Sequence, residues 1–179
     1  DFRKILDFPQ TIALTATATH QVRKDIREVL QLDEKELELF AEGIDRPNLD
    51  LAAVEVWSDT EKFEYIRALA EDGGTGIVYF SLIKTLEEQA EKLREIRGSD
   101  RIELYHGKLS PAEKKRIYDR FSASKPEDEL MLLATNAFGM GVDKPDIRYI
   151  VHAQIPGSIE SYYQEIGRAG RDGAPAETM

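Results

Sequence analysis

The sequence contains no cysteine, and this absence excludes several kinds of site. Without thiols there are no disulfide bonds and no thiolate metal centre. The chain has three histidines, His20, His106 and His152, and none has a second histidine at a spacing suited to a shared ligand. A zinc site is therefore not expected. The lack of disulfides is compatible with a reducing compartment.

Long apolar runs are also missing, so no segment reads as a membrane span and no membrane partner is expected. The N-terminus has no signal-peptide pattern. The chain starts at Asp1 rather than at methionine, which suggests a fragment of a longer protein. Its 179 residues, 41% hydrophobic and 32% charged, are typical of a soluble globular protein of one domain, or one domain and part of another.

Positive charge is scarce relative to negative charge. The formal net charge of −10 argues against a protein that coats DNA nonspecifically, because such binding depends on a basic surface. A nucleic-acid motor is still allowed, since net charge sums the whole surface whereas a strand contacts one groove.

Strands and helices alternate along the second half of the chain. Buried strands are predicted where short apolar runs occur, at 77–80, 102–105, 130–134 and 147–152. Helices are predicted after the capping boxes Ser58–Glu61 and Ser110–Glu113, over 85–97, and around 162–165. This alternation predicts an α/β fold with a mainly parallel sheet.

The first half of the chain is less regular. Apolar spacing predicts a helix over 19–30, and short strands are predicted at 11–14, 37–40 and 49–56. The turn-rich segment 43–48 is the candidate domain boundary. The sequence Gly73-Gly74-Thr75-Gly76 precedes a strand and lacks a Gly-Lys-Thr ending, so it is interpreted as a plain turn rather than a phosphate loop.

Polar and small residues follow three of the predicted strands. Ser81, His106 and Thr135 come directly after strands, and a glycine-rich turn, Gly139 to Asp143, follows Thr135. Ligands collect at the carboxyl ends of parallel strands, so these residues are expected to share one functional edge.

Two arginines lie three positions apart near the end of the chain, in Gly167-Arg168 and Gly170-Arg171. A guanidinium is always charged and offers a planar fork of donors to phosphate oxygens. An isolated Gly-Arg pair is usually solvated surface charge. Here the preceding glycine-rich turn, strand and helix favour a polyphosphate site instead.

The motifs now resemble a known family. ATNAFGMGVDKPDIRYIVH, followed by SYYQEIGRAGRDG, resembles the last two motifs of superfamily 2 helicases as RecQ-type DNA helicases carry them. Residues 15–19 (TATAT) resemble the motif that links hydrolysis to movement. Residues 45–49 (DRPNL) resemble the interdomain segment, and 105–110 (YHGKLS) resemble a further family motif. The resemblance covers nearly the whole chain in the family's order.

The resemblance implies a RecA-like three-layer domain with a mainly parallel sheet over 45–179, the second motor domain of an ATP-dependent DNA helicase. Residues 1–44 would then be the tail of the first motor domain and the linker. The implied partners are DNA, as single strands and duplex junctions, and the first motor domain of the same protein. Expected roles are in DNA repair and recombination, in the bacterial cytoplasm and nucleoid or in a eukaryotic nucleus.

Site residues follow from matching positions. Arg171 and Arg168 match the arginines that reach across the interdomain cleft, with Arg171 matching the finger on the terminal phosphate. Nucleotide contacts are implied for Gln164, Asp143 and Gly141. Nucleic-acid contacts are expected at Ser81, His106, Gly107, Thr135 and Asn136, because neutral donors hold a backbone without reading its sequence. Thr15 and Thr17 would couple hydrolysis to movement.

The family pattern is incomplete here. The phosphate-binding GxxxxGK[ST] loop and the Asp-Glu pair that holds magnesium are missing. ATP and Mg²⁺ are therefore expected mainly on the first domain, and this chain alone is expected not to hydrolyse ATP.

Other readings are open. Thr135 and Asn136 could cap a turn, His106 could be a satisfied strand-end histidine, and Thr15 and Thr17 could belong to a helix cap. The chain could also belong to another superfamily 2 motor, either an RNA helicase or a duplex translocase, or be a non-catalytic helicase-like binding module. Gln164-Glu165 disfavours an RNA helicase, because that branch usually has His-Arg in this motif. The two arginines, Arg168 and Arg171, disfavour a non-catalytic module, because a scaffold does not need two phosphate-binding guanidiniums.

Overall fold

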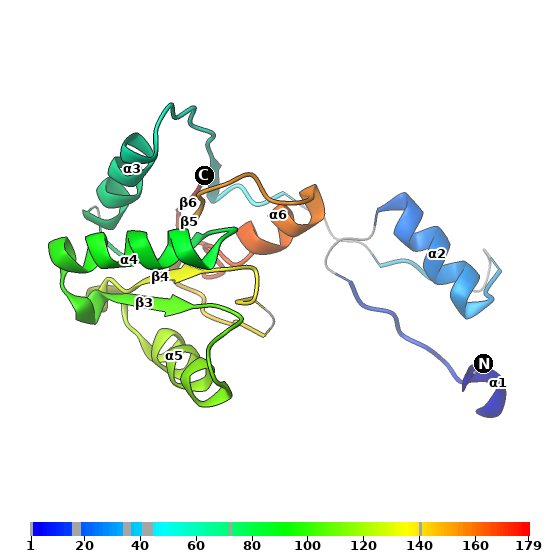
Figure 1. Ribbon diagram of the computed structural model, residues 1–179. Coiled ribbons are helices and arrows are strands. Elements are labelled where there is room, and N and C mark those ends of the chain that lie inside the picture. Colours follow the sequence, from blue (N-terminus) through cyan, green and yellow to red (C-terminus); the bar gives the residue numbers. More distant parts are fainter. Residues whose placement is uncertain (1, 16–18, 34–36, 41–44, 72, 140) are drawn as a thin grey trace. The chain divides into compact units, whose positions relative to one another are not determined.

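The computed structural model describes residues 2–15, 19–33, 37–40, 45–71, 73–139 and 141–179 (Figure 1). Backbone contacts divide the chain into two compact units, Asp1–Asp45 and Arg46–Met179.

The first unit contains two helices, α1 (Phe2–Ile5) and α2 (His20–Leu30). The predicted helix at 19–30 is confirmed. Thr19 is its N-cap, because the Thr19 hydroxyl accepts a hydrogen bond from the Val22 amide at 3.3 Å.

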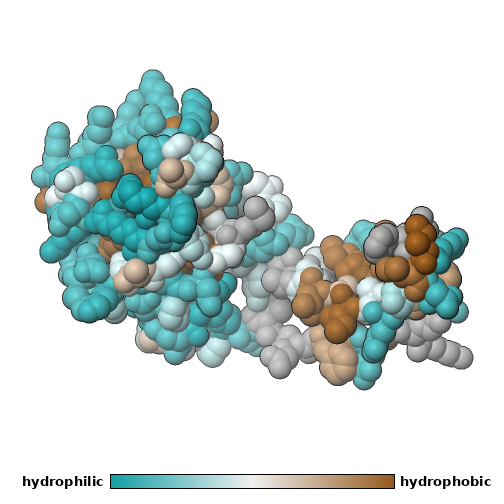
Figure 2. Space-filling model, turned by 90° about the horizontal axis from the view of Figure 1, so that it is seen from below, coloured by the Kyte–Doolittle hydropathy of each residue, from teal (hydrophilic) through white to brown (hydrophobic). Residues whose placement is uncertain are grey.

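The strands predicted at 11–14 and 37–40 are wrong, because the described part of this unit contains no strand. A strand is stable only when a neighbour completes its hydrogen-bond ladder. Ile12 and Leu14 are instead 81% and 91% exposed. Figure 2 shows the apolar side chains that this unit leaves on its surface.

The second unit is built on a six-stranded sheet with the order β1-β6-β5-β2-β4-β3, in which all neighbouring strands pair parallel. The strands are β1 (Leu49–Leu51), β2 (Thr75–Tyr79), β3 (Ile102–Tyr105), β4 (Met131–Ala134), β5 (Ile147–His152) and β6 (Ala176–Thr178).

The central strands agree with the sequence prediction, and the edge near β1 does not. β3 and β5 have the predicted bounds. β1 ends at Leu51 rather than Val56, because its partner β6 reaches only Thr178, which pairs with Leu51. β6 was not predicted, since three residues with alternating burial give little signal.

Helices cover both faces of the sheet, which makes three layers (Figure 1). α3 (Asp59–Glu71) and α4 (Ile83–Arg97) pack on one face through Ile66, Leu86 and Leu93. α5 (Pro111–Ala123) and α6 (Ile159–Ile166) pack on the other through Ile117, Phe121 and Ile166. Short 3-10 helices span Ser99–Arg101 and Pro126–Asp128. The predicted RecA-like α/β fold is confirmed.

The two predicted capping boxes differ. At α5 the box is complete, because the Ser110 hydroxyl accepts from the Glu113 amide and the Glu113 carboxylate accepts from the Ser110 amide at 2.9 Å. At α3 the Ser58 hydroxyl accepts from the Glu61 amide at 3.1 Å, but the Glu61 carboxylate accepts from the Trp57 amide. The Trp57 side chain is 82% exposed.

A buried carboxylate on the edge strand β3 gives a pH-dependent prediction. Glu103 is 4% exposed and accepts hydrogen bonds from Arg116 at 2.9 Å and Arg120 at 2.7 Å. Burial raises the pKa of Glu103, but the hydrogen bonds and charges of the two arginines outweigh it and hold that pKa below its ordinary value of 4.5. A lowered folded pKa stabilises the protein above the unfolded pKa, and this contribution is lost as the pH falls through the folded pKa.

We expect Glu103→Gln to lower the free energy of unfolding at pH 7 by about 1–3 kcal/mol, since it removes charge-assisted hydrogen bonds to a buried group. The difference from the wild-type chain should shrink as the pH falls below 4.5, in urea unfolding followed by circular dichroism. Glu95→Gln, on the exposed face of α4, is the control and should change little. A difference that stays constant down to pH 3 would contradict this account.

Within the described ranges, no helix is long and apolar enough to cross a membrane. The same ranges contain no group of three or more histidine, aspartate or glutamate side chains that could hold a metal ion.

Candidate functional site

The two arginines predicted from the sequence lie on a tight turn that follows α6, at residues Gly167–Arg171, here called the arginine turn. α6 begins at the N-cap Ser158, whose hydroxyl accepts from the Ser161 amide at 3.1 Å. The turn doubles back at Gly170, whose φ of +54° lies in the left-handed region that favours glycine. The Gly170 amide then donates to the Ile147 carbonyl at 2.9 Å, which ties the turn to the start of β5.

Two residues of the segment before β1 hold the carbonyl groups of the arginine turn. Arg46 donates to the carbonyl oxygens of Ala169 at 2.8 Å and Gly170 at 3.0 Å, and more weakly to Gly167 at 3.4 Å. Asn48 donates to the Gly170 carbonyl at 2.8 Å and to Ala174 at 3.0 Å. A cation near the C-terminus of a helix also interacts favourably with the negative end of the helix dipole. The arginine turn is thus held by side chains more than 100 residues away in sequence.

Arg171 contacts the glycine-rich turn Gly139–Asp143, here called the glycine turn. Its Nη1 donates to the Asp143 carboxylate at 3.0 Å and to the Val142 carbonyl at 3.1 Å. The Arg171 side chain is 37% exposed and that of Asp143 is 87% exposed. The guanidinium is therefore oriented by an acid and still faces solvent, where it can meet an anion.

Arg168 contacts the same glycine turn from a less exposed position. Its Nη1 donates to the Gly139 carbonyl. A Cβ at Gly139 would lie 2.6 Å from Arg168 Nη2, so only glycine allows this approach. The Arg168 Nε is buried without a hydrogen-bond partner. The solvent-facing Arg171 beside it offers the planar fork of donors that suits a phosphate.

The other expected nucleotide contacts lie near the arginines. Gln164 is exposed on α6, and Gly141 is exposed with a φ of +80° and no atom within 4 Å of an added Cβ. Tyr118 of α5, which the sequence argument did not include, donates from its hydroxyl to the Gly141 carbonyl at 2.8 Å. α5 therefore anchors the glycine turn.

The strand-end residues come to one edge of the sheet, because β2, β4 and β3 are neighbours in the sheet order. Ser81 and Asn136 are exposed there, as is Gly107. The Ser81 amide donates to the Gln154 side chain at 2.9 Å.

The two buried members of this edge have partly satisfied side chains. Thr135 is 6% exposed, and its hydroxyl accepts from the Ala137 amide at 3.5 Å, a contact that fits the turn-capping reading. His106 is 8% exposed, its Nδ1 has no partner, and its Nε2 lies 3.8 Å from a Glu87 carboxylate oxygen. His106 is therefore not fully satisfied by the described protein groups.

The two threonines that the resemblance implies as coupling residues belong to the first unit. Thr15 is exposed in a segment without helix or strand, and Thr17 lies outside the described residues.

The structure adds residues that sequence reasoning missed. They hold the arginine turn, the glycine turn, the residue before the glycine turn, or the end of α6, and they are Arg46, Asn48, Tyr79, Tyr118, His152 and Glu165. Only the position of Arg46 and Asn48 within the DRPNL motif gave a signal, and that motif was interpreted only as a linker.

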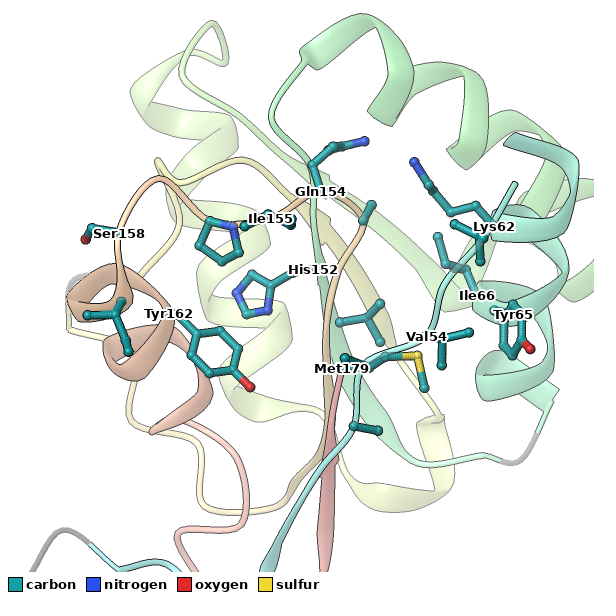
Figure 3. Close-up of a pocket in the computed structure, with 17 residues that line it drawn as sticks. Val54, Lys62, Tyr65, Ile66, His152, Gln154, Ile155, Ser158, Tyr162 and Met179 are labelled. Atoms are coloured by element: carbon teal, nitrogen blue, oxygen red, sulfur yellow. The ribbon is translucent and has the colours of Figure 1, made fainter. Parts of the chain in front are cut away.

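An apolar groove of about 790 Å³ has His152 among its lining residues (Figure 3). Its walls also include Val54 before α3, Tyr65 on α3, Met179 after β6, Ile155 before α6 and Tyr162 on α6. None of the site residues predicted from the sequence lines it.

Comparisons with known proteins agree with the motifs. The family model described as "Helicase conserved C-terminal domain" matches residues 61–173. The chain is similar to the probable ATP-dependent DNA helicase RecS of Bacillus subtilis (strain 168), at 39% identity over 99% of this chain and 35% of the relative. It is also similar to the ATP-dependent DNA helicase RecQ of the same organism, at 41% identity over 99% of this chain and 29% of the relative.

The chain thus spans about a third of the length of these relatives. Among solved structures, S. cerevisiae Dbp5 bound to RNA and ADP BeF3 superimposes with a TM-score of 0.70 at 22% identity, over 92% of this chain and 42% of that one. This likeness supports the fold.

Proposed function

Because the chain belongs to the helicase conserved C-terminal domain family, we propose that it is the second motor domain of a RecQ-type ATP-dependent DNA helicase, preceded by the tail of the first. The observation that carries the proposal is the convergence of Arg168 and Arg171 on the glycine turn. The Arg171 side chain is held by Asp143 and is still 37% exposed, so its fork of donors can reach an anion.

The arginine turn is the part of the ATP site that this domain contributes. Arg171 is the finger that meets the terminal phosphate, and Arg168 supports it. Asp143 keeps the Arg171 fork oriented, and Gln164 and Gly141 lie beside the nucleotide. ATP supplies the phosphoanhydride bond, and this chain supplies positive charge to the phosphoryl group from across a cleft.

The strand-end edge is the part of the nucleic-acid track that this domain contributes. Ser81, Gly107, Asn136 and Thr135 offer hydroxyl, amide and backbone donors, and His106 has an unpaired ring nitrogen. Neutral donors at strand ends hold phosphates without reading bases, which suits a motor that steps along any sequence. A chain with a net charge of −10 can bind DNA in this way, since only the track contacts the strand.

The first unit belongs to the preceding motor domain in this proposal. Its surface carries Ile12, Leu14 and Phe40 at more than 80% exposure, which fits a piece whose core is completed by other residues of that domain. ATP and Mg²⁺ are held mainly there, and Thr15 and Thr17 couple hydrolysis to movement. Closure of the cleft would bring the arginines to ATP and pull the strand. The parent protein would act in repair and recombination, in the bacterial cytoplasm and nucleoid or in the nucleus.

The test compares a full-length protein that contains this chain with the 179-residue chain alone. The full-length protein should hydrolyse ATP faster with single-stranded DNA and should separate a tailed duplex. The chain alone should release no phosphate above background. Equal stimulation of hydrolysis by RNA would favour an RNA helicase. DNA binding without ATP hydrolysis would favour a non-catalytic module. Phosphate release by the chain alone would contradict the proposal that the ATP site is shared between two domains.

A further inference from the structure

A buried polar pair joins the end of β5 to the last turn of α6. His152 Nε2 donates to the Glu165 Oε2 at 2.7 Å, and the two side chains are only 5% and 15% exposed. A carboxylate can only accept, so Nε2 must carry the hydrogen. A buried hydrogen bond to a charged group is strong, and losing one partner leaves the other unsatisfied.

Aromatic rings hold the imidazole in place on two sides. The Tyr79 ring stacks on His152 with centroids 5.4 Å apart and planes 16° apart. The Tyr162 ring lies 5.3 Å away, and Figure 3 shows the His152 ring between the end of β5 and Tyr162 of α6. The orientation of His152, and with it the position of Glu165, is therefore determined by β2, β5 and α6 together.

The same cluster reaches Arg168. The Arg168 amide donates to the Glu165 carbonyl at 3.2 Å, so the two residues are adjacent along the last turn. The Tyr79 hydroxyl donates to the Phe138 carbonyl at 3.4 Å, next to the Gly139 carbonyl that accepts from Arg168. Burial raises the pKa of Tyr79 well above its ordinary value, so the hydroxyl keeps its hydrogen and can donate.

We propose that Glu165 and His152 are positioning residues for the arginine turn, because their hydrogen bond fixes the end of α6 from which Arg168 and Arg171 project. This inference rests on the proposed function. His152 and Glu165 bind each other rather than a guanidinium, so the pair acts through geometry. A misplaced arginine slows the chemical step without weakening ATP binding, which the first domain provides.

The experiment measures DNA-stimulated ATP hydrolysis by the full-length protein. Glu165→Ala and His152→Leu should each lower kcat by about 10- to 100-fold, while the KM for ATP and the Kd for single-stranded DNA change by less than about threefold. Glu165→Gln and His152→Gln keep an acceptor and a donor, and they should retain kcat within about threefold. The double variant should be no slower than the slower single variant, as expected for two partners in one interaction.

Glu160→Ala is the matched control, because Glu160 is exposed on the first turn of the same helix, and its kcat should not change. Thermal unfolding identifies variants that do not fold, and the decision then rests on His152→Gln against His152→Leu. The inference is overturned if the kcat of Glu165→Ala and His152→Leu stays within threefold of the wild-type value, or if the two glutamine variants lower kcat as much as these do. It is also overturned if KM for ATP rises by the same factor by which kcat falls. A wild-type protein that does not hydrolyse ATP would instead overturn the proposed function.

Discussion

Arg171→Ala in the full-length protein is expected to abolish nearly all DNA-stimulated ATP turnover. An arginine finger contributes about a thousand-fold or more to the rate of phosphoryl transfer. Arg171 has a solvent-facing guanidinium oriented by Asp143, as this role requires. Binding of single-stranded DNA, measured by fluorescence anisotropy, should stay within about threefold, because the strand-end edge is separate.

Two further variants test the assignment: one separates the guanidinium's planar pair of donors from its positive charge, and the other is a control. Arg171→Lys keeps a positive charge but loses the planar pair of donors, so it should recover only a small part of the rate. Arg67→Ala, which removes an arginine paired with Glu64 and Glu71 on α3, is the control and should hydrolyse ATP like the wild type. Turnover by Arg171→Ala within a few-fold of the wild-type rate would show that the finger assignment is wrong.

Gly170→Ala is expected to lower the free energy of unfolding of the 179-residue chain by about 2–4 kcal/mol, with a matching fall in Tm. Two effects add. An L-residue at φ +54° is strained, and a Cβ there would lie 2.5 Å from Asn48 Nδ2 and 2.8 Å from the Ala174 carbonyl oxygen. Relief of this contact would displace the hydrogen bonds that hold the arginine turn. Urea unfolding of the chain measures the stability.

Gly173→Ala separates the two effects. Gly173 also has a positive φ, +82°, but nothing lies within 4 Å of an added Cβ, so only the backbone strain of about 1 kcal/mol or slightly more applies. The full-length Gly170→Ala protein should also lose most of its ATP turnover, whereas Gly173→Ala should lose little. Equal destabilisation by the two variants would mean that the contacts of Gly170 contribute nothing.

The local signals in the sequence were reliable where short-range chemistry decides the outcome. The capping box at Ser110, the helix cap at Thr19 and the apolar run at Ile147 each form the predicted element. Predictions failed at 11–14 and 37–40, because a β-prone run becomes a strand only if a partner strand lies beside it. β6 was missed because its three residues have little apolar pattern of their own. They form a strand because β1 and β5 lie on either side and complete the hydrogen-bond ladder.

The candidate site also has one part that the sequence predicts and one part that it does not. The motif residues Arg168, Arg171 and Asp143 could be named from the sequence, and the structure brings both arginines into contact with the glycine turn that contains Asp143. The supporting residues could not, because they lie far from the motif in sequence. Arg46 reaches carbonyl groups 123 and 124 positions later, and Glu165 meets a histidine on a different element.

By itself, then, the sequence determined the α/β class, the family and the chemical identity of the arginine turn, since each of these depends on residue type and on spacing within one segment. Only the tertiary structure decided how that turn is held. A guanidinium is directed by whichever carbonyl, carboxylate or ring the fold brings beside it. At Arg168 and Arg171 those neighbours are the carbonyl and carboxylate groups of the glycine turn, while Arg46 and Asn48 of the segment before β1 hold the backbone of the arginine turn.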